Sequence, residues 1–299
     1  MFGGKVISLV VGTLNRTVEL DRLLTSLDQQ THKDFEVVIV DQNSDDRVSE
    51  VLEEHRDLQI RHLHCGRGLS RARNVGLRAA SGSICAIPDD DCWYPPKLLE
   101  SVNSWFDDNP DFDVFLTSVR DESGDLQGPR RRSRIGCECD RQSVWHHGIS
   151  INAFWRHSVT DDVGAFDELI GAGCETIFQS GEETDYFIRA LDRGHRAWYE
   201  PNISVFHPSL CSKETLLRQT YPYALGTGYV LRKHHYSAYR LAKDFLAYSA
   251  AGALISMCKA DARTARIRLL RVLGILVGYM SASRSTREGY VPDCNVTAE

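Results

Sequence analysis

The sequence predicts an α/β fold in which a mostly parallel sheet is flanked by helices and followed by a C-terminal helical appendage. Over the first ~100 residues, short continuous apolar runs alternate with segments of helical periodicity. Such runs are typical of parallel strands that are buried on both faces. The last ~80 residues show helical patterns only. We therefore expect an α/β domain over residues 1–210 and a helical region over residues 211–299.

Each element of the α/β domain follows from a local pattern. Apolar runs predict the first four strands, at Val6–Val11, Phe35–Val40, Gln59–His64 and Ser83–Pro88. Apolar residues at helical spacing predict the helices between them, around Leu20–Leu27, Val48–His55 and Ala72–Ala79. The later elements are a helix near Lys97–Asp107, a strand near Phe112–Thr117, a polar loop at Asp121–Arg141, a helix opening at Gly181, and strands at Ala197–Glu200 and Ile203–His207.

Composition excludes several classes of protein. Hydrophobic residues make up 42% of the chain and charged residues 25%, which is ordinary for a globular protein. A net charge of -6 argues against nucleic-acid binding. The apolar run Val6–Val11 is too short for a secretory signal, and the nine cysteines show no disulfide-framework spacing. We expect free thiols and a cytoplasmic location.

The C-terminal region carries two uncharged apolar stretches, Phe245–Cys258 and Val272–Ser283. Neither reaches the ~20 residues of a membrane-spanning helix. Between them lies a basic stretch, made of Lys259, Arg263, Arg266, Arg268 and Arg271. The two stretches are interpreted either as helices lying peripherally on an anionic membrane or as an appendage packed on the α/β domain.

Three adjacent aspartates, Asp89, Asp90 and Asp91, follow the fourth predicted strand. A divalent cation would relieve their mutual repulsion, and such an ion commonly bridges one or two carboxylates and substrate phosphates. The alternative is a solvated acidic turn. Asp41 follows another strand, and ligands of parallel sheets bind beyond the carboxyl ends of the strands. This shared placement favours a metal-dependent site, in which Asp41 could accept hydrogen bonds from a base or ribose.

Three further groups are candidates for chemistry. Glu182, Glu183 and Asp185 could supply a general base, or they could be the acidic residues that commonly begin a helix. The glycine-rich stretch before Arg71 could place a basic group on a phosphate, although its spacing matches no known phosphate loop. His207 ends the last strand of the domain, and could be a metal ligand or a structural histidine.

Taken together, these motifs resemble the family 2 glycosyltransferases with a GT-A fold, and bacterial surface-polysaccharide glycosyltransferases in particular. The resemblance covers roughly residues 5–208, and the ordered set of motifs is more specific than any one of them. The matching stretches are Val6–Arg16, Phe35–Ser44, Gly68–Leu77, Ala80–Gly82, Ile87–Asp91, Val163–Asp167, Gly181–Arg189 and Pro201–His207.

The resemblance implies a role for each candidate residue. The donor, linked to UDP or GDP, would be bound by Thr13, Asn15, Asp41, Arg71, Asp89 and Asp90. Asp91 and His207 would hold Mn²⁺ or Mg²⁺, and Glu183 would be the catalytic base with Glu182 beside it. The chain departs from the family pattern at Gln42, where a second aspartate is common, and at Glu182-Glu183, where Glu-Asp is common. The second departure leaves open which glutamate is the base.

The implied activity is inverting, metal-dependent hexosyl transfer from a nucleotide-sugar to a glycan. The resemblance suggests a lipid-linked oligosaccharide acceptor at the inner membrane face, in polysaccharide biosynthesis. Two alternatives are a sugar nucleotidyltransferase and a non-catalytic glycan-binding module on the same fold. The first should carry a basic glycine loop after the first strand, which Val11–Asn15 lacks. The second is disfavoured by the intact acidic clusters.

Overall fold

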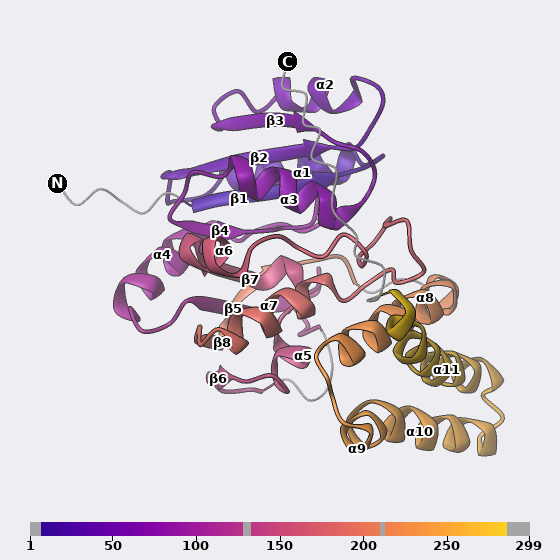
Figure 1. Cartoon of the computed structure of the whole chain (residues 1–299). Helices are drawn as coiled ribbons and strands as arrows, with labels where there is room; N and C mark the ends of the chain where they lie inside the picture. The colour runs from indigo at the N-terminus through magenta and orange to yellow at the C-terminus, as the bar shows by residue number, and fades with distance from the viewer. Residues whose placement is uncertain (1–6, 128–132, 210–212, 286–299) are drawn as a thin grey trace. The chain divides into compact units, whose positions relative to one another are not determined.

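The computed structural model describes residues 7–127, 133–209 and 213–285 (Figure 1). The chain divides into two compact units. The first unit comprises Met1–Phe166 and Tyr186–Ser209, and the second comprises Asp167–Asp185 and Leu210–Glu299. The segment Asp167–Asp185 therefore groups with the C-terminal helices, although the sequence places it inside the α/β domain.

The first unit is built on one eight-stranded sheet with the order β3-β2-β1-β4-β7-β5-β8-β6. Strands β1, β2, β3 and β4 are parallel neighbours, and β5 is parallel to β8, whereas β7 and β6 run antiparallel. The sheet is therefore mostly parallel, as predicted. The strand bounds are Ile7–Thr13 (β1), Phe35–Asp41 (β2), Ile60–His64 (β3), Ile84–Ala86 (β4), Val114–Arg120 (β5), Cys137–Cys139 (β6), Ala153–Arg156 (β7) and Ala197–Phe206 (β8).

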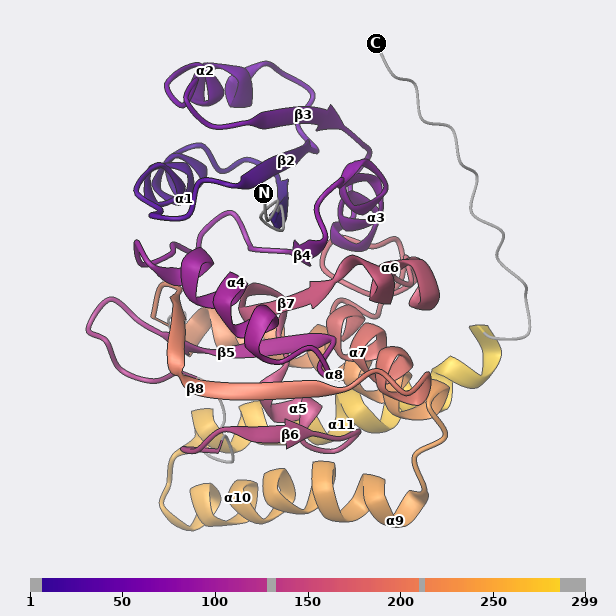
Figure 2. The same cartoon turned by 90° about the vertical axis from the view of Figure 1, so that its left-hand side faces the viewer.

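Helices cover both faces of this sheet (Figure 2). One face carries α1 (Val18–Asp28), α2 (Arg47–Glu53) and α4 (Leu98–Asp108). The other carries α3 (Leu69–Ala79), α6 (His157–Val163) and the part of α7 (Glu182–Asp192) that belongs to this unit. Two short elements, α5 (Val144–His147) and the 3-10 turn η1 (Ser150–Asn152), precede β7.

The two faces are packed in different ways. Toward α1, alternate residues of β1 and β2 join the leucines of that helix in one core, because side chains alternate across a strand. Toward α3, the helix lies almost directly on the sheet. A Cβ atom at Gly76 would stand 2.2 Å from Cγ1 of Val10, so only glycine permits this approach. The close packing fixes α3, and with it the side chains at its start.

Three strands differ from the sequence prediction. The antiparallel strand β7 was not predicted, because a four-residue strand offers little periodicity. Strand β6 lies within the stretch predicted as the loop Asp121–Arg141. The two predicted closing strands form the single strand β8, in which the pairing with β5 jumps from Glu200 to Ser204. Pro201 stands at this irregularity, where it interrupts the apolar pattern of the sequence.

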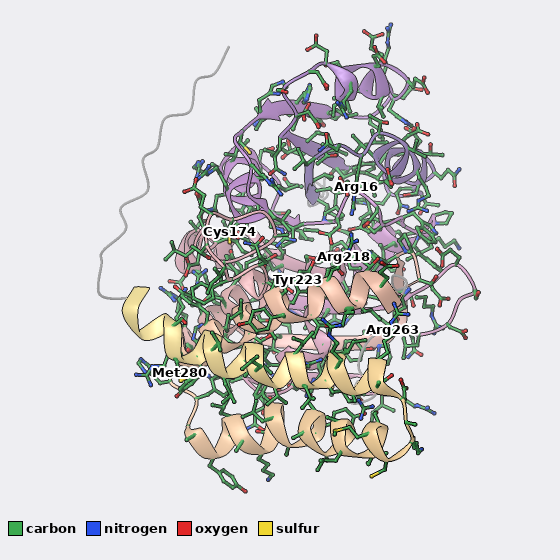
Figure 3. The ribbon with its side chains drawn as sticks, turned by 90° about the vertical axis from the view of Figure 1, so that its right-hand side faces the viewer. Arg16, Cys174, Arg218, Tyr223, Arg263 and Met280 are labelled. Carbon is green, nitrogen blue, oxygen red and sulfur yellow. The ribbon has the colours of Figure 1, made fainter. Side chains whose placement is uncertain are left out.

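The second unit contains the helical region that the sequence predicts. Its elements are α8 (Lys213–Lys233), α9 (Ala238–Arg240), the π-helical segment η2 (Leu241–Leu246), α10 (Ala247–Cys258) and α11 (Ala262–Ser285). Figure 3 labels Arg218 and Tyr223 on α8, and Arg263 and Met280 on α11. Among the described residues, no helix has the length and apolar character needed to cross a membrane.

Helices α8 and α11 pack backbone against backbone. A Cβ atom at Gly228 would lie 2.2 Å from the carbonyl oxygen of Ile275, and one at Gly278 would lie 2.1 Å from that of Leu225. Any larger residue would therefore force the helices apart. The four arginines of the predicted basic stretch lie within α11 rather than between two helices, which corrects the sequence interpretation.

Candidate active site

The acidic turn, by which we mean Asp89, Asp90 and Asp91, lies just beyond the carboxyl end of β4. Its neighbour β1 ends at Thr13, which pairs with Asp41 at the end of β2. The structure therefore brings these candidate residues to one edge of the sheet. This is the edge at which parallel α/β sheets bind their ligands.

Asp90 is the buried member of the acidic turn. Its carboxylate accepts hydrogen bonds from Oγ1 of Thr13 at 2.9 Å and from Nη1 of Arg16 at 2.8 Å. Burial raises the pKa of Asp90 to about 6, although Arg16 and Thr13 both act to lower it. Asp90 therefore ties the loop after β1 to the acidic turn, and it offers little surface to a ligand.

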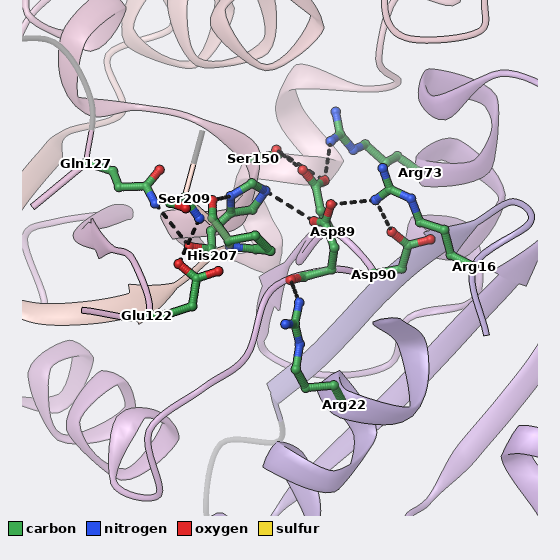
Figure 4. A network of polar contacts seen from close by, with 12 residues as sticks. Arg16, Arg22, Arg73, Asp89, Asp90, Glu122, Gln127, Ser150, His207 and Ser209 are labelled. Carbon is green, nitrogen blue, oxygen red and sulfur yellow. Dashed lines mark hydrogen bonds and ion pairs between the residues drawn. The ribbon is translucent and has the colours of Figure 1, made fainter. Parts of the chain in front are cut away.

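Asp91 is held between two basic side chains. Nη1 of Arg16 lies 2.6 Å from its Oδ2 atom, and Nε2 of His207 lies 3.2 Å from its Oδ1 atom. Burial alone would raise the pKa of Asp91, but His207 and Arg16 outweigh that effect and lower it. In the same way, burial acts to lower the pKa of His207, and the Asp91 carboxylate more than reverses this. Figure 4 shows Arg16 and His207 approaching the acidic turn from opposite sides.

Asp89 is contacted by an arginine that the sequence analysis does not single out. Nη2 of Arg73, a residue only 2% exposed, lies 3.2 Å from Oδ1 of Asp89 (Figure 4). The hydroxyl of Ser150 donates to the same oxygen at 3.3 Å. Arg71 is half-buried and lies two positions earlier on α3, about 200° around the helix. Sequence analysis assigned Arg71 to the donor phosphate, and it did not identify Arg73, Ser150 and Arg16 as partners of the aspartates.

His207 reaches the acidic turn because two distant segments pair beside it. The backbone amides of Trp93 and Phe206 each donate to the other residue's carbonyl oxygen, both at 3.0 Å. Their rings stack with centroids 5.6 Å apart. Arg22 reinforces this junction, since its guanidinium lies over the Trp93 ring and donates to the backbone oxygen of Asp91 at 2.5 Å. The pairing places the end of β8 directly against the turn.

Asp89, Asp91 and His207 together fit a divalent metal ion. One potential ligand atom from each lies within 4.8 Å of the other two. Two carboxylate oxygens and one imidazole nitrogen are ordinary ligands for such an ion. Sequence analysis assigned Asp91 and His207 to the metal and Asp89 to the donor, whereas the structure brings all three together.

Asp41 is almost completely buried, with 1% of its surface exposed. Its Oδ1 atom accepts hydrogen bonds from the backbone amide and the side-chain amide of Asn43, at 2.8 and 2.7 Å. Nε2 of His62 lies 3.3 Å from its Oδ2 atom. Asn15, which has a positive φ of 59°, donates its backbone N–H to Oδ1 of Asn43 at 2.8 Å. Asn43 therefore connects Asp41 to the loop after β1.

Gln42, one of the two departures from the family pattern named in the sequence analysis, has a structural contact here. Its Oε1 atom accepts a hydrogen bond from the backbone N–H of Gly68 at 2.8 Å. Gly68 is the residue before α3 and has a φ of 133°. Gln42 thus helps to hold the start of the helix that carries Arg71 and Arg73.

The acidic helix start, by which we mean Glu182, Glu183 and Asp185, belongs to the second unit. Asp185 is fully buried and pairs with Nζ of Lys233 and Nε2 of His234, both at 2.8 Å. Lys233 also contacts Asp167 at 2.7 Å. Glu182 is buried and Glu183 is half-buried. Asp185 is therefore committed to an ion-pair network, and Glu183 is the most accessible carboxylate of the three.

Comparison with known proteins identifies the family of the chain. The model of Glycosyl transferase family 2 matches residues 8–166, which is more than half of the chain. An uncharacterized glycosyltransferase of Haemophilus influenzae is 36% identical over 120 residues, covering 39% of this chain and 40% of the relative. The alignments with several relatives span less than half of the relative's length. The chain belongs to glycosyl transferase family 2.

Solved structures show the same fold. S. aureus TarS 1–349, in complex with UDP, superposes with a TM-score of 0.60 at 18% identity, covering 97% of this chain and 94% of that one. The mannosyltransferase PcManGT from Pyrobaculum calidifontis, in complex with GDP-Man and Mn²⁺, gives a TM-score of 0.58 at 17% identity and covers 97% and 77%. The predicted GT-A fold is confirmed.

Proposed function

We propose that this chain is an inverting, metal-dependent glycosyltransferase that moves a hexosyl group from a nucleotide-sugar to a glycan acceptor. The observation that supports it most is the cluster of Asp89, Asp91 and His207 at the ligand-binding edge of the sheet. Arg16, Arg73 and His207, which come from three distant segments, each contact an aspartate of the acidic turn. Such an arrangement suits the binding of a diphosphate through a cation.

The donor is proposed to lie along the edge formed by the ends of β1, β2 and β4. Asp41 would recognise the base or ribose, with Asn15 holding the adjoining loop. Thr13 and Asp90 would fix the loop that carries Arg16, and Arg71 would contact phosphate. Asp89 would contact the donor and would also be a ligand of the metal. The TarS and PcManGT structures, which contain UDP and GDP-Man, support a donor of the UDP or GDP type.

The metal is proposed to be Mn²⁺ rather than Mg²⁺, with Asp89, Asp91 and His207 as its protein ligands. Imidazole nitrogen is a poorer ligand for Mg²⁺, which prefers oxygen throughout. When bound, the ion would act as a Lewis acid and stabilise the negative charge of the departing diphosphate. Arg16 holds Asp90 and Asp91 in place, and it adds positive charge at the same edge.

Glu183 is proposed as the catalytic base. Its carboxylate would take the proton of an acceptor hydroxyl as that oxygen bonds to the anomeric carbon and the bond to the diphosphate breaks. A single displacement of this kind inverts the anomeric configuration. Glu183 is favoured over Glu182 and Asp185 because its side chain is half-buried, whereas both of those residues are buried.

The acceptor is proposed to be a lipid-linked oligosaccharide at the inner face of the cytoplasmic membrane. Helix α10 exposes a group of large apolar side chains: Tyr248, Leu254, Ile255 and Met257 are each at least 55% exposed. Lys259 follows the helix, and the arginines of α11 lie in the same unit. An exposed apolar helix accompanied by basic residues suits peripheral binding to anionic lipid.

Calorimetric titration of the full chain with UDP and with GDP, each with and without Mn²⁺, tests the proposed function. We expect one nucleotide to bind only with Mn²⁺, and Asp91→Asn to abolish that dependence. Asp161→Asn is the matched control, because the Asp161 side chain is 77% exposed. The absence of binding to both nucleotides in well-folded wild-type protein would contradict the proposal.

A further inference from the structure

A second group of potential metal ligands lies at the same edge of the sheet, away from the acidic turn. Strands β2 and β3 are parallel neighbours, and their register pairs Asp41 with His64. His62 and His64 are two residues apart in β3, so their side chains project from the same face. Their rings lie 4.5 Å apart, centroid to centroid. Two imidazoles and one carboxylate therefore converge on one point.

The distances between the potential ligand atoms suit a small metal ion. Oδ2 of Asp41 lies 3.3 Å from Nε2 of His62 and 3.9 Å from Nδ1 of His64, and all three atoms lie within 4.8 Å of one another. In tetrahedral coordination with bonds of about 2.0–2.1 Å, ligand atoms stand about 3.3 Å apart. Only a small movement of the exposed His64 ring would bring its Nδ1 atom to that distance from Oδ2 of Asp41.

The surroundings of Asp41 also resemble those of a metal ligand. Asn43 donates two hydrogen bonds to Oδ1, which orients Oδ2 toward the imidazoles. Metal-binding carboxylates are commonly held in this way by hydrogen bonds from a second layer of residues. Asp41 is 1% exposed, and a buried carboxylate is costly without a compensating positive charge. The His64 side chain is 62% exposed, which leaves a side open to water as a further ligand.

We propose that Asp41, His62 and His64 form a zinc site. Two nitrogen ligands and one oxygen ligand favour Zn²⁺ over Mg²⁺ or Ca²⁺, which prefer oxygen throughout. The acidic turn has the opposite balance, with two oxygen ligands and one nitrogen ligand. The two clusters therefore select different ions.

Zinc at this site has a consequence that rests on the proposed function. The ion occupies Oδ2 of Asp41, the residue proposed to recognise the donor base or ribose. Nucleotide and Zn²⁺ therefore exclude one another, so that Zn²⁺ inhibits donor binding while Mn²⁺ supports it.

Zinc binding is tested in full-length protein without a polyhistidine tag, in the Asp91→Asn background that disables the other cluster. Calorimetric titration with Zn²⁺ should show one site, and Co²⁺ as a spectroscopic probe should give the intense visible absorption of four-coordinate cobalt. His64→Ala should weaken the binding of both Zn²⁺ and Co²⁺. The loss should be at least the 10–100-fold in metal affinity that removal of a second-layer partner typically costs. His32→Ala, at a histidine whose ring contacts the backbone oxygen of Asp34 at 3.2 Å, is the matched control.

Two results would overturn the zinc site: no Zn²⁺ binding in the Asp91→Asn background, or equal binding after His64→Ala. Asn43→Ala provides a second check and should weaken Zn²⁺ binding about tenfold, because the orientation of the Asp41 carboxylate is lost. In wild-type protein, the nucleotide that binds should weaken Zn²⁺ binding at least tenfold. Equal Zn²⁺ affinity with and without that nucleotide would overturn the competition. Failure of every nucleotide to bind would contradict the proposed function, and the Co²⁺ spectrum would still decide the zinc site.

Discussion

The acidic turn and the acidic helix start look alike in the sequence, yet their surroundings differ in the structure. In the first unit, the carboxylates of the acidic turn are each contacted by a cationic side chain, and two of them converge with His207 as potential metal ligands. In the second unit, Asp185 is fully buried between Lys233 and His234, whereas Glu183 is half-buried.

This difference teaches that adjacent carboxylates do not share a role. A carboxylate that is buried and fully paired supports the fold, because its charge is already compensated. One that is only partly buried can still reach a ligand. On that basis Asp90 and Asp185 are structural, while Asp89, Asp91 and Glu183, which are less buried, are the candidates for function.

Asp91→Asn should produce the largest effect. Removal of one metal ligand is expected to lower Mn²⁺-dependent turnover about 10³-fold, since a Lewis-acid metal contributes several kcal/mol. Donor-sugar transfer or hydrolysis, measured against Mn²⁺ concentration, checks this. Thermal unfolding should change little, because Arg16 keeps its contact with Asp90. Unchanged turnover would remove Asp91 from the metal site.

Asp185→Asn should affect stability instead. Breaking a buried ion pair costs about 3–5 kcal/mol, and the lower end is expected because Lys233 keeps Asp167 as a partner. Denaturant unfolding measures the change. The surface pair of Asp244 with Arg240 gives the control, Asp244→Asn, which should cost under about 1 kcal/mol. Normal stability with lost turnover would instead make Asp185 the base.

Glu183→Gln should lower turnover about 10²-fold and leave nucleotide affinity unchanged, because general-base catalysis contributes about 10²–10⁴-fold. Steady-state kinetics combined with calorimetric nucleotide titration separates the two effects. Glu53→Gln, at a side chain that is 73% exposed, is the matched control. A normal rate in Glu183→Gln, with a slow one in Glu182→Gln, would transfer the role to Glu182.

The smallest effect is expected at His55, which forms a structural cluster with two carboxylates. It serves as a baseline for the acidic turn and the acidic helix start. His55 is 6% exposed and contacts Asp28 at 2.6 Å and Asp21 at 3.0 Å. Burial acts to lower the pKa of His55, but the two carboxylates outweigh it and raise the pKa above 6.5.

Because the folded-state pKa of His55 is raised, its stabilising contribution is complete below the unfolded-state pKa of about 6.5 and is lost as the pH rises through the folded-state value. His55→Gln should therefore lower the free energy of unfolding by about 1 kcal/mol at pH 6, and by less at pH 9. Denaturant unfolding of both proteins at the two pH values checks this. An equal difference at both would show that His55 is neutral in the folded protein.

The sequence predicts the parallel half of the sheet because β1, β2 and β4 are continuous apolar runs that end at polar residues. It does not predict β7, whose antiparallel place between β4 and β5 depends on tertiary packing. Pro201 divides β8 into two apparent strands, because the irregular pairing there has no signature in the apolar pattern.

The candidate site was predictable in part. Asp91 and His207 were selected by motif, and the structure brings them together. Arg16, Arg73 and Ser150 were missed as partners of the acidic turn, because only the folded chain brings them to the aspartates. The helical position of Arg73 held a signal, since Arg73 is the one charged residue among those that α3 buries. The roles of Asn15, Arg71 and Glu183 stay predictions.

The pairing of Trp93 with Phe206 makes the cluster of Asp89, Asp91 and His207 a late product of folding. The two halves of the cluster are separated by over a hundred residues, and contacts at such separation form slowly because a long loop must close first. During synthesis, the first four strands emerge from the ribosome long before β8. The nascent chain therefore carries its aspartates without the histidine, and the complete ligand set exists only after β8 has joined the sheet.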